Sequence, residues 1–359
     1  MFELIINFYD KHERHISSVA LLGGFVFDNF TLQRIDLLFE NLVIIFYLVL
    51  SGGGVVLRNY LDECPPKSKF FKKVYDFLPL FIQFAFGGLF SGFFIFYSRS
   101  VTLSSSWPFV LMLLILLIGN EFFKKQYQRM TFQMSVYFVA IFSFLIFFIP
   151  ILIKNISPLA FILSGVLSLL VIYLFILGLK KIVPIKYNKS RINLRNSVVS
   201  IFILINVLYF SNLIPPIPLS LKDAGVYHNI QRVNGSYLVT DEDTKWYKEI
   251  FKRDTIYLNQ KEGAYVFSSV FAPTDLNIKV VHDWQYFDEE KDEWTSTGEI
   301  SFPILGGRDG GYRGFSKKEN VFTGKWRVDI ETERDQIIGR VRFNIEVDSA
   351  NVRLKTETL

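Results

Sequence analysis

Residues 134–153 read MSVYFVAIFSFLIFFIPILI, which is twenty consecutive residues without a charge. A bilayer core about 30 Å thick is crossed by about 20 apolar residues in an α-helix, which rises about 1.5 Å per residue. Backbone groups that meet no water must pair within their own segment, so such a run is expected to be helical. The stretch therefore predicts a membrane-spanning helix.

Further apolar runs lie on both sides of this stretch and predict about seven transmembrane helices. A shorter run, Ile16–Leu32, contains Asp28, and it either spans fully or forms a hairpin with the next run. The remaining runs are Leu37–Leu57, Phe77–Tyr97, Trp107–Phe123, Pro158–Leu179 and Val198–Leu213. We interpret residues 1–15 as a cytoplasmic or interfacial N-terminus and residues 16–214 as a transmembrane helical domain.

The composition agrees with a membrane protein and excludes several kinds of site. Half of the 359 residues are apolar, 20% are charged, and the mean hydropathy is +0.29. A single cysteine excludes an intrachain disulfide and a cysteine-based zinc site, and four histidines leave little for a histidine cluster. We expect neither a metal nor a cofactor.

Basic residues gather in alternate connections between the apolar runs. Sixteen lysines and arginines fall in the N-terminus and in loops 58–75, 124–133 and 180–195, against three in the other connections. By the positive-inside rule the N-terminus and these loops are cytoplasmic, and everything after the last run is extracytoplasmic. The formal charge of +5 therefore indicates membrane topology and not nucleic-acid binding.

Several residues within the runs are candidates for function or for helix packing. Charged groups are costly at membrane depth, so each carboxyl group is a functional candidate, although hydration near an interface offers a structural alternative. The polar candidates are Asp28, Glu40, Asn120, Glu121 and Asn206, and the two asparagines can hydrogen-bond between helices. Gly88 and Gly92 form a GxxxG pair, which favours close packing either within the chain or at a dimer face.

The pattern changes after the last run. Residues 213–221 read LIPPIPLSL, and the prolines favour a stiff, extended exit. Beyond it, apolar residues alternate with polar ones in 278–287, 326–331 and 340–347, which predicts strands with one buried face. Residues 333–336 are predicted to join the last two strands as a hairpin, and residues 244–253 to form a short helix. We interpret residues 215–221 as a linker and residues 222–359 as an all-β, antiparallel sandwich-like extracytoplasmic domain.

Four segments of this region carry a family resemblance. LIPPIPLSLKDAGVYH (213–228), HDW (282–284), GKWRVDIET (324–332) and the strand 338–347 resemble the bacterial polytopic membrane proteins that carry domain of unknown function 2914. The resemblance covers mainly residues 275–348 and the proline-rich exit. It implies helices followed by a β-rich tail in a bacterial cytoplasmic (inner) membrane. The family has no established activity, so the resemblance supplies no catalytic residue.

The β region offers candidate ligand-binding residues, each with a structural alternative. His282, Trp284 and Tyr286 share one face of a strand, which is either buried core or an aromatic platform for a sugar or peptide. Trp294 and Trp326 are candidates to extend that platform. Arg308 and Arg313, in the glycine-rich stretch 306–314, are candidates for binding an anionic envelope polymer, and the stretch itself is predicted to be a mobile loop.

No motif in the β region indicates catalysis. The glycine-rich stretch lacks the Lys-Ser/Thr pair of a phosphate-binding loop. The acidic residues of 288–293 lack the EF-hand spacing and are predicted to form a solvated hairpin loop. There is no GxSxG sequence, and no serine stands at a readable spacing from the histidines of the region. The residues favour a binding protein over an enzyme.

Three functions remain open at this stage. The leading hypothesis is that the β domain binds an envelope glycan or protein while the helices anchor it. The second is a membrane enzyme or carrier for a lipid-linked substrate, which would use Asp28, Glu40 or Glu121 beside an internal groove. The third is a structural subunit of a membrane assembly. The expected partners are the lipid bilayer, an envelope glycan or a membrane or periplasmic protein, and a second copy of the chain.

Overall fold

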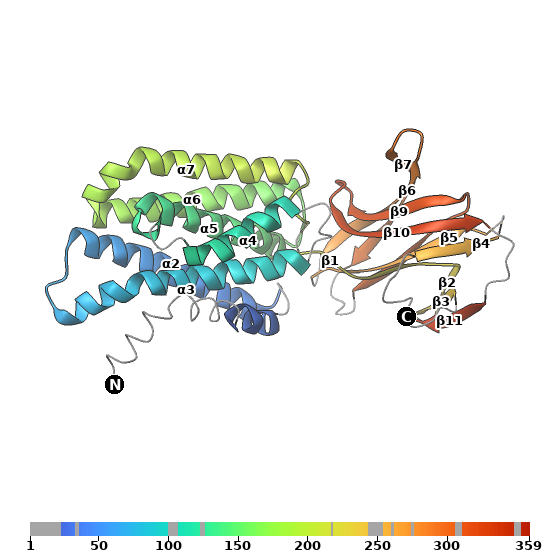
Figure 1. Cartoon of the computed structure of the whole chain (residues 1–359), viewed down its shortest axis with the longest axis horizontal. Helices are drawn as coiled ribbons and strands as arrows, with labels where there is room; N and C mark the ends of the chain where they lie inside the picture. The colour runs from blue at the N-terminus through green and yellow to red at the C-terminus, as the bar shows by residue number, and fades with distance from the viewer. Residues whose placement is uncertain are drawn as a thin grey trace. The chain divides into compact units, whose positions relative to one another are not determined.

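The computed structural model describes two compact units, which divide between Ile214 and Pro215 (Figure 1). The described residues up to Ile214 form a helical unit, and those from Pro215 form a β unit. The described ranges are 23–32, 36–99, 107–122, 126–216, 218–242, 254–259, 262–273, 276–305, 311–347 and 353–359. The helix expected over 244–253 lies outside them, as do residues 16–22 of the first apolar run.

In the described part of the helical unit, residues 23–31 are helical. The elements that follow are α2 (Leu38–Glu63), α3 (Lys69–Arg99), α4 (Trp107–Phe122), η1 (Gln126–Gln128), α5 (Met130–Ile153), α6 (Pro158–Ile182) and α7 (Pro184–Phe210). Among the described residues, α2, α3, α5, α6 and α7 are long and apolar enough to cross a membrane, whereas α4 has 16 residues. These helices are compatible with a multi-pass membrane protein.

Helix α5, which contains the stretch 134–153, lies at the centre of the helical unit. It packs against α2, α6 and α7, and 78% of its most apolar window is buried, against 22% for α7. Its aromatic side chains stack on neighbouring helices, for example Phe142 on Phe202 of α7 with ring centroids 5.7 Å apart. The most apolar run is therefore the core of the bundle, and α6 and α7 form part of its outer wall.

The prediction of a basic loop over residues 180–195 is wrong. Helix α6 continues to Ile182 and α7 begins at Pro184, so Val183 alone separates them. Proline is well suited to the first helical position because the amide hydrogen that it lacks would have no helical partner there. Lysine and arginine are good helix formers. Hydropathy reports only the part of a helix that suits lipid, so the polar first turns of α7 were not recognised.

The described residues of the β unit form three sheets. Its described strands are β1 (Ser220–Tyr227), β2 (Asn229–Val233), β3 (Ser236–Glu242), β4 (Asp254–Leu258), β5 (Ala264–Phe271), β6 (Asn277–Asp288), β7 (Glu293–Leu305), β8 (Tyr312–Lys318), β9 (Gly324–Thr332), β10 (Ile337–Val347) and β11 (Leu354–Thr358). The strand orders are β1-β5-β8, β4-β10-β9-β6-β7 and β11-β3-β2. Described strand pairs are antiparallel except β4 with β10, which is parallel.

Two predicted hairpins are confirmed and one predicted loop is corrected. Residues 333–336 connect β9 to β10, and residues 289–292 connect β6 to β7. The stretch 306–314 is a loop only in part, because β8 begins at Tyr312 and pairs with β5. Gly314 belongs to this strand, and a Cβ atom there would collide with the ring of Phe302. The glycine is thus needed for close packing at this position.

Candidate functional site

The line of aromatic residues on β6 is buried between two sheets. His282 and Trp284 are 0% exposed, and Trp326 on β9 is 1% exposed. Ser268 of β5 and Ser316 of β8 lie 2.8 Å from His282 Nε2 and Nδ1, respectively. Because these serines belong to the sheet β1-β5-β8, that sheet faces the five-stranded sheet here. Of the two alternatives for this line, the geometry favours buried core over an exposed platform.

The hydrogen bonds around His282 define a neutral ring. Trp284 Nε1 donates to Ser316 Oγ at 2.9 Å, and an indole nitrogen can only donate. The hydroxyl hydrogen of Ser316 is then satisfied by donating to His282 Nδ1, which leaves Nε2–H to donate to Ser268 Oγ. Burial lowers the pKa of His282 to about 3, which agrees with a ring that carries no charge.

Half-buried Tyr286 and buried Trp326 continue this line toward the end of the strand. Trp326 Nε1 donates to the carbonyl oxygen of Phe322 at 2.9 Å. The Tyr286 ring lies 5.1 Å from the Phe322 ring and 6.0 Å from the Trp326 ring, measured between centroids. These contacts assign both residues to packing in the β unit.

Trp294 lies on the opposite face of the five-stranded sheet. Its β7 position pairs with Phe287 of β6, and the two rings meet edge to face with centroids 5.3 Å apart. The guanidinium of Arg327 lies 4.4 Å above the Trp294 ring, and Arg327 Nε donates to Gln285 Oε1 at 2.7 Å. Lys325 Nζ lies 5.2 Å from the Phe287 ring. We call Gln285, Phe287, Trp294, Lys325 and Arg327 the aromatic–basic strip.

A buried group of carboxylates lies beside the aromatic–basic strip. Asp283 of β6 and Asp329 of β9 are directly paired in the sheet, and each is less than a tenth exposed. Arg340 of β10 binds Asp329 through two hydrogen bonds, one of them 2.6 Å long. Asp283 accepts hydrogen bonds from Ser296 and Gln285. Both aspartates are thus held by neighbours on adjacent strands.

Glu331 completes this group and differs from the two aspartates. It is 8% exposed, and among the described residues its carboxyl group has no hydrogen-bond or ion-pair partner. Burial, followed by repulsion from Asp283, Asp335 and Asp329, raises the pKa of Glu331 to about 8. Within the described ranges no group of histidine, cysteine or acidic residues has metal-binding geometry. With a pKa of about 8, the carboxyl group of Glu331 is mostly protonated at pH 7.

Of the two arginine candidates, only Arg313 lies among the described residues, and it does not join the aromatic–basic strip. Arg308 lies outside the described residues. Arg313 lies on β8 in the other sheet, where its carbonyl oxygen accepts a hydrogen bond from the Tyr237 hydroxyl at 2.9 Å. The structure thus separates Arg313 from Trp294.

The helical unit brings three of the sequence candidates to one cavity. Asp28, Gly88 and Asn120 come from three helices and line a cavity of about 430 Å³ together with Gln83 and Ser91, among others. Asp28 is 8% exposed. A carboxyl group, a carboxamide and a hydroxyl thus converge at a single site within the apolar unit.

The glycine pair of α3 serves packing inside the chain. A Cβ atom on Gly88 would lie 2.7 Å from the Tyr47 ring, and one on Gly92 would lie 2.7 Å from Ile44 Cδ1. Both neighbours belong to α2. This geometry favours the intrachain alternative over a dimer face.

A chain of buried hydrogen bonds leads away from the cavity toward the junction of α6 and α7. Asn120 and Gln83 exchange side-chain to carbonyl bonds of 2.7 and 2.8 Å, and Tyr127 donates to Asn120 at 2.6 Å. Gln133 donates to the Tyr127 carbonyl and accepts from Asn59. Gln83, Asn59 and Gln133 were not among the candidates that the sequence indicated. A glutamine within the run Phe77–Tyr97 was a usable signal, whereas Asn59 and Gln133 lie just beyond the runs.

The other polar candidates of the helical unit are Asn206, Glu40 and Glu121. Asn120 makes the expected bond between helices, but the Asn206 amide donates to Phe202 of its own helix at 2.8 Å. The expectation of an interhelical bond from Asn206 is therefore not met. Glu40 is 4% exposed, and its Oε2 has no hydrogen-bond partner among the described residues. Glu121 belongs to α4, but its side chain lies outside the described part.

The geometry thus defines a protein with an apolar helical unit followed by a β-rich C-terminal unit. Residues 277–345 match the model of the family described as "Protein of unknown function (DUF2914)", which confirms the resemblance seen in the sequence. This segment runs from β6 to β10 and therefore includes both His282 and the aromatic–basic strip.

Neither the curated proteins nor the solved structures provide an informative match to the whole chain. The curated proteins contain no match. Among solved structures, the chain matches Pseudomonas fluorescens alkylpurine DNA glycosylase AlkC bound to DNA containing an abasic site analog. The identity is 9%, the match covers 88% of this chain and 99% of that one, and the TM-score is 0.21. A score this low carries no argument about fold or function.

Proposed function

We propose that the β unit binds an envelope glycan at the aromatic–basic strip, and that the helical unit anchors it in the bacterial cytoplasmic membrane. The observation that carries the proposal is the Trp294–Arg327 pair beside the Gln285 amide. Sugars bind on aromatic rings flanked by a few polar groups with fixed orientation. The strip offers these groups, and Trp294 and Arg327 are only partly buried.

Two further features support a ligand at this face. The residues of the strip stand on paired strands, which hold side chains more firmly than loops do. Arg342 is exposed, pairs with Arg327 in the sheet, and has no ion-pair partner among the described residues. Lys325 and Arg327 are already paired with Glu289 and Asp329, so Arg342 is the cation that favours a glycan with negative charge at this face.

Binding is tested with the full-length protein in lipid nanodiscs. The wild type is expected to bind at least one anionic wall polymer or peptidoglycan fragment. Isothermal titration calorimetry, or surface plasmon resonance on the immobilised protein, measures the affinity. Trp294→Ala and Arg327→Gln should each weaken binding at least tenfold. Phe322→Ala is the matched control, because Phe322 is an aromatic residue that is 47% exposed and packs with Trp326 on the other side of the sheet. Absence of binding by the wild type, or equal loss in the control, contradicts the proposal.

We also propose the orientation in which the N-terminus is cytoplasmic and the β unit is extracytoplasmic. Sixteen basic residues lie in the N-terminus and at alternate ends of the apolar runs, including the polar ends of α6 and α7, and their distribution supports this orientation. Protease added to sealed spheroplasts should cleave the β unit, whereas a reporter fused after Leu359 should be inactive if it requires the cytosol. Protection of the β unit together with a cytosolic signal from the reporter contradicts this orientation.

The cavity at Asp28 favours a second candidate function, which is action on a lipid-linked substrate. A buried carboxyl group beside Asn120 and Ser91 resembles the polar sites that membrane carriers and enzymes place between helices. Asp28→Asn should then abolish a cellular phenotype of the gene without reducing protein levels. Asp76→Asn is the control, because Asp76 is an exposed residue of α3. A phenotype that depends only on the β unit excludes this candidate.

A further inference from the structure

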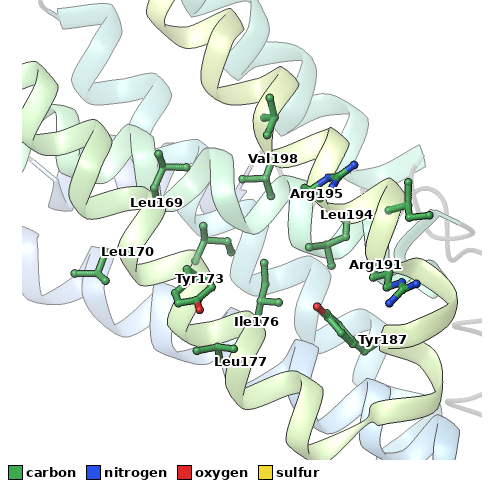
Figure 2. A pocket seen from close by; sticks show the side chains of 13 residues that line it. Leu169, Leu170, Tyr173, Ile176, Leu177, Tyr187, Arg191, Leu194, Arg195 and Val198 are labelled. Atoms are coloured by element: carbon green, nitrogen blue, oxygen red, sulfur yellow. The ribbon is translucent and has the colours of Figure 1, made fainter.

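A long groove runs between α6 and α7 on the outside of the helical unit (Figure 2). Its volume is about 950 Å³, at the upper end of the range for ligand pockets. Tyr187 and Val199 lie at its two ends on α7, twelve residues apart, which corresponds to a length of about 18 Å. The α6 wall is apolar and includes Leu170, Ile176 and Leu177.

Two arginines project into this groove from one face of α7. Arg191 and Arg195 are four residues apart, so they stand one above the other on the helix surface, as Figure 2 shows. Both are exposed, and neither has an ion pair or hydrogen bond with the described residues. Lys186, nearer the start of the same helix, is by contrast paired with Asp62. The groove lining contains no acidic residue, so its two guanidinium groups are not compensated.

The two arginines lie next to the point on α7 where its apolar run begins. They precede the apolar run that starts at Val198, whereas the opposite wall of α6 is apolar throughout Leu169–Leu177. The groove therefore has a basic section where α7 enters its apolar run and, farther from the α6–α7 junction, an apolar section lined by Leu169, Leu170 and Val199. A free anion would use only the first section, but a phospholipid would fill both.

We propose that this groove binds one anionic phospholipid of the surrounding bilayer. The phosphate lies between Arg191 and Arg195, whose planar guanidinium groups match phosphate oxygens, and the acyl chains lie along Leu169, Leu170 and Val199. Basic pockets between transmembrane helices are typical binding sites for anionic headgroups. The inference rests on the membrane location proposed above, not on the ligand of the β unit.

The test uses the full-length, delipidated protein in detergent and titrates phosphatidylglycerol against phosphatidylcholine with identical acyl chains. Native mass spectrometry counts the lipids retained, and the shift in unfolding temperature gives the apparent affinity. Phosphatidylglycerol should bind at least tenfold more tightly than phosphatidylcholine, with one lipid per chain retained at low occupancy. Equal affinity for the two lipids overturns the proposal.

Two variants separate a built site from general attraction. Arg191→Ala/Arg195→Ala should lose at least tenfold in affinity for phosphatidylglycerol. Lys181→Ala/Lys189→Ala removes the same charge from exposed positions of α6 and α7 outside the groove, and its affinity should stay within twofold of wild type. An equal loss in both variants would mean that net charge alone attracts the lipid, which overturns the proposal.

A third variant and a free-anion arm test the apolar section. Val199→Trp leaves both arginines in place but fills the groove from a position that is 49% exposed, so the helix itself is not disturbed. It should weaken phosphatidylglycerol at least fivefold without lowering the unfolding temperature of the lipid-free protein. Millimolar inorganic phosphate should not raise the unfolding temperature of the wild type. Equal protection by phosphate, or unchanged affinity in Val199→Trp, shows an anion site without a lipid and overturns the proposal. Loss of membrane pelleting by the wild type would instead refute the membrane location.

Discussion

The Oγ atom of Ser316 lies 2.8 Å from Nδ1 of His282, and the two residues belong to different sheets of the β unit. The same hydroxyl accepts the Trp284 indole hydrogen at 2.9 Å. One small side chain therefore satisfies two buried polar groups at the place where the sheets meet. Removing the Ser316 hydroxyl would leave Trp284 Nε1 and His282 Nδ1 without this hydrogen-bond partner.

Ser316→Ala is expected to destabilise the β unit by about 2–4 kcal/mol, because it strands the Trp284 and His282 nitrogens without partners. Urea unfolding of the full-length protein, followed by the fluorescence of the buried tryptophans, measures this change. Ser301→Ala is the control, because Ser301 is exposed on β7. Similar stabilities for the two variants would show that the bonds of Ser316 contribute little.

The lowered pKa of His282 predicts that the protein loses stability at acid pH. Its pKa is about 3 in the folded chain and 6.5 ordinarily, so the unfolded chain takes up a proton that the folded chain refuses. The free energy of unfolding should therefore fall as the pH drops from 6.5 toward 3, with this group contributing up to about 1.4 kcal/mol per pH unit. His282→Gln should have a flatter profile over this range, although it is less stable at pH 7. Parallel profiles for the two proteins would contradict the assignment.

The raised pKa of Glu331 predicts a free energy of unfolding that falls as the pH rises. Its pKa is about 8 in the folded chain and 4.5 ordinarily, so the folded chain retains a proton that the unfolded chain releases. Stability should therefore fall as the pH rises from 4.5 to 8. Glu331→Gln removes this dependence and should be more stable than wild type at pH 8, with little difference near pH 4.5. Unfolding curves at the two pH values measure the difference, and a variant that is less stable at pH 8 contradicts it.

Gly88→Leu predicts a packing defect inside the helical unit. The new side chain would meet the Tyr47 ring of α2, so the free energy of unfolding in detergent should fall by about 1–3 kcal/mol. Gly178→Leu is the control, because no atom lies within 4 Å of a Cβ built at Gly178. Light scattering should show the same particle mass for both variants. A change of mass with unchanged stability would assign Gly88 to an interface between copies instead.

Much of the local structure follows from the sequence because periodicity reports local exposure. The run 134–153 is a helix and the alternating segments 278–287, 326–331 and 340–347 are strands, as predicted. The errors occur where a helix leaves the apolar environment. Residues 184–197 are helical although they are polar, because helix propensity and a favourable proline do not alter hydropathy.

The sequence by itself determined the apolar helices, the alternating strands, the two-part organisation and the relation of residues 277–345 to a family. Only the tertiary structure decided which face of the five-stranded sheet is covered. Alternation separates Trp284 from Trp294 but does not say which one is buried, because both faces carry aromatic side chains. Residues far apart in the chain supply that cover, such as Ser316 over His282. The convergence of Asp28 with Asn120, and of Leu170 with Arg195, likewise depends on how helices pack, since no local pattern encodes those contacts.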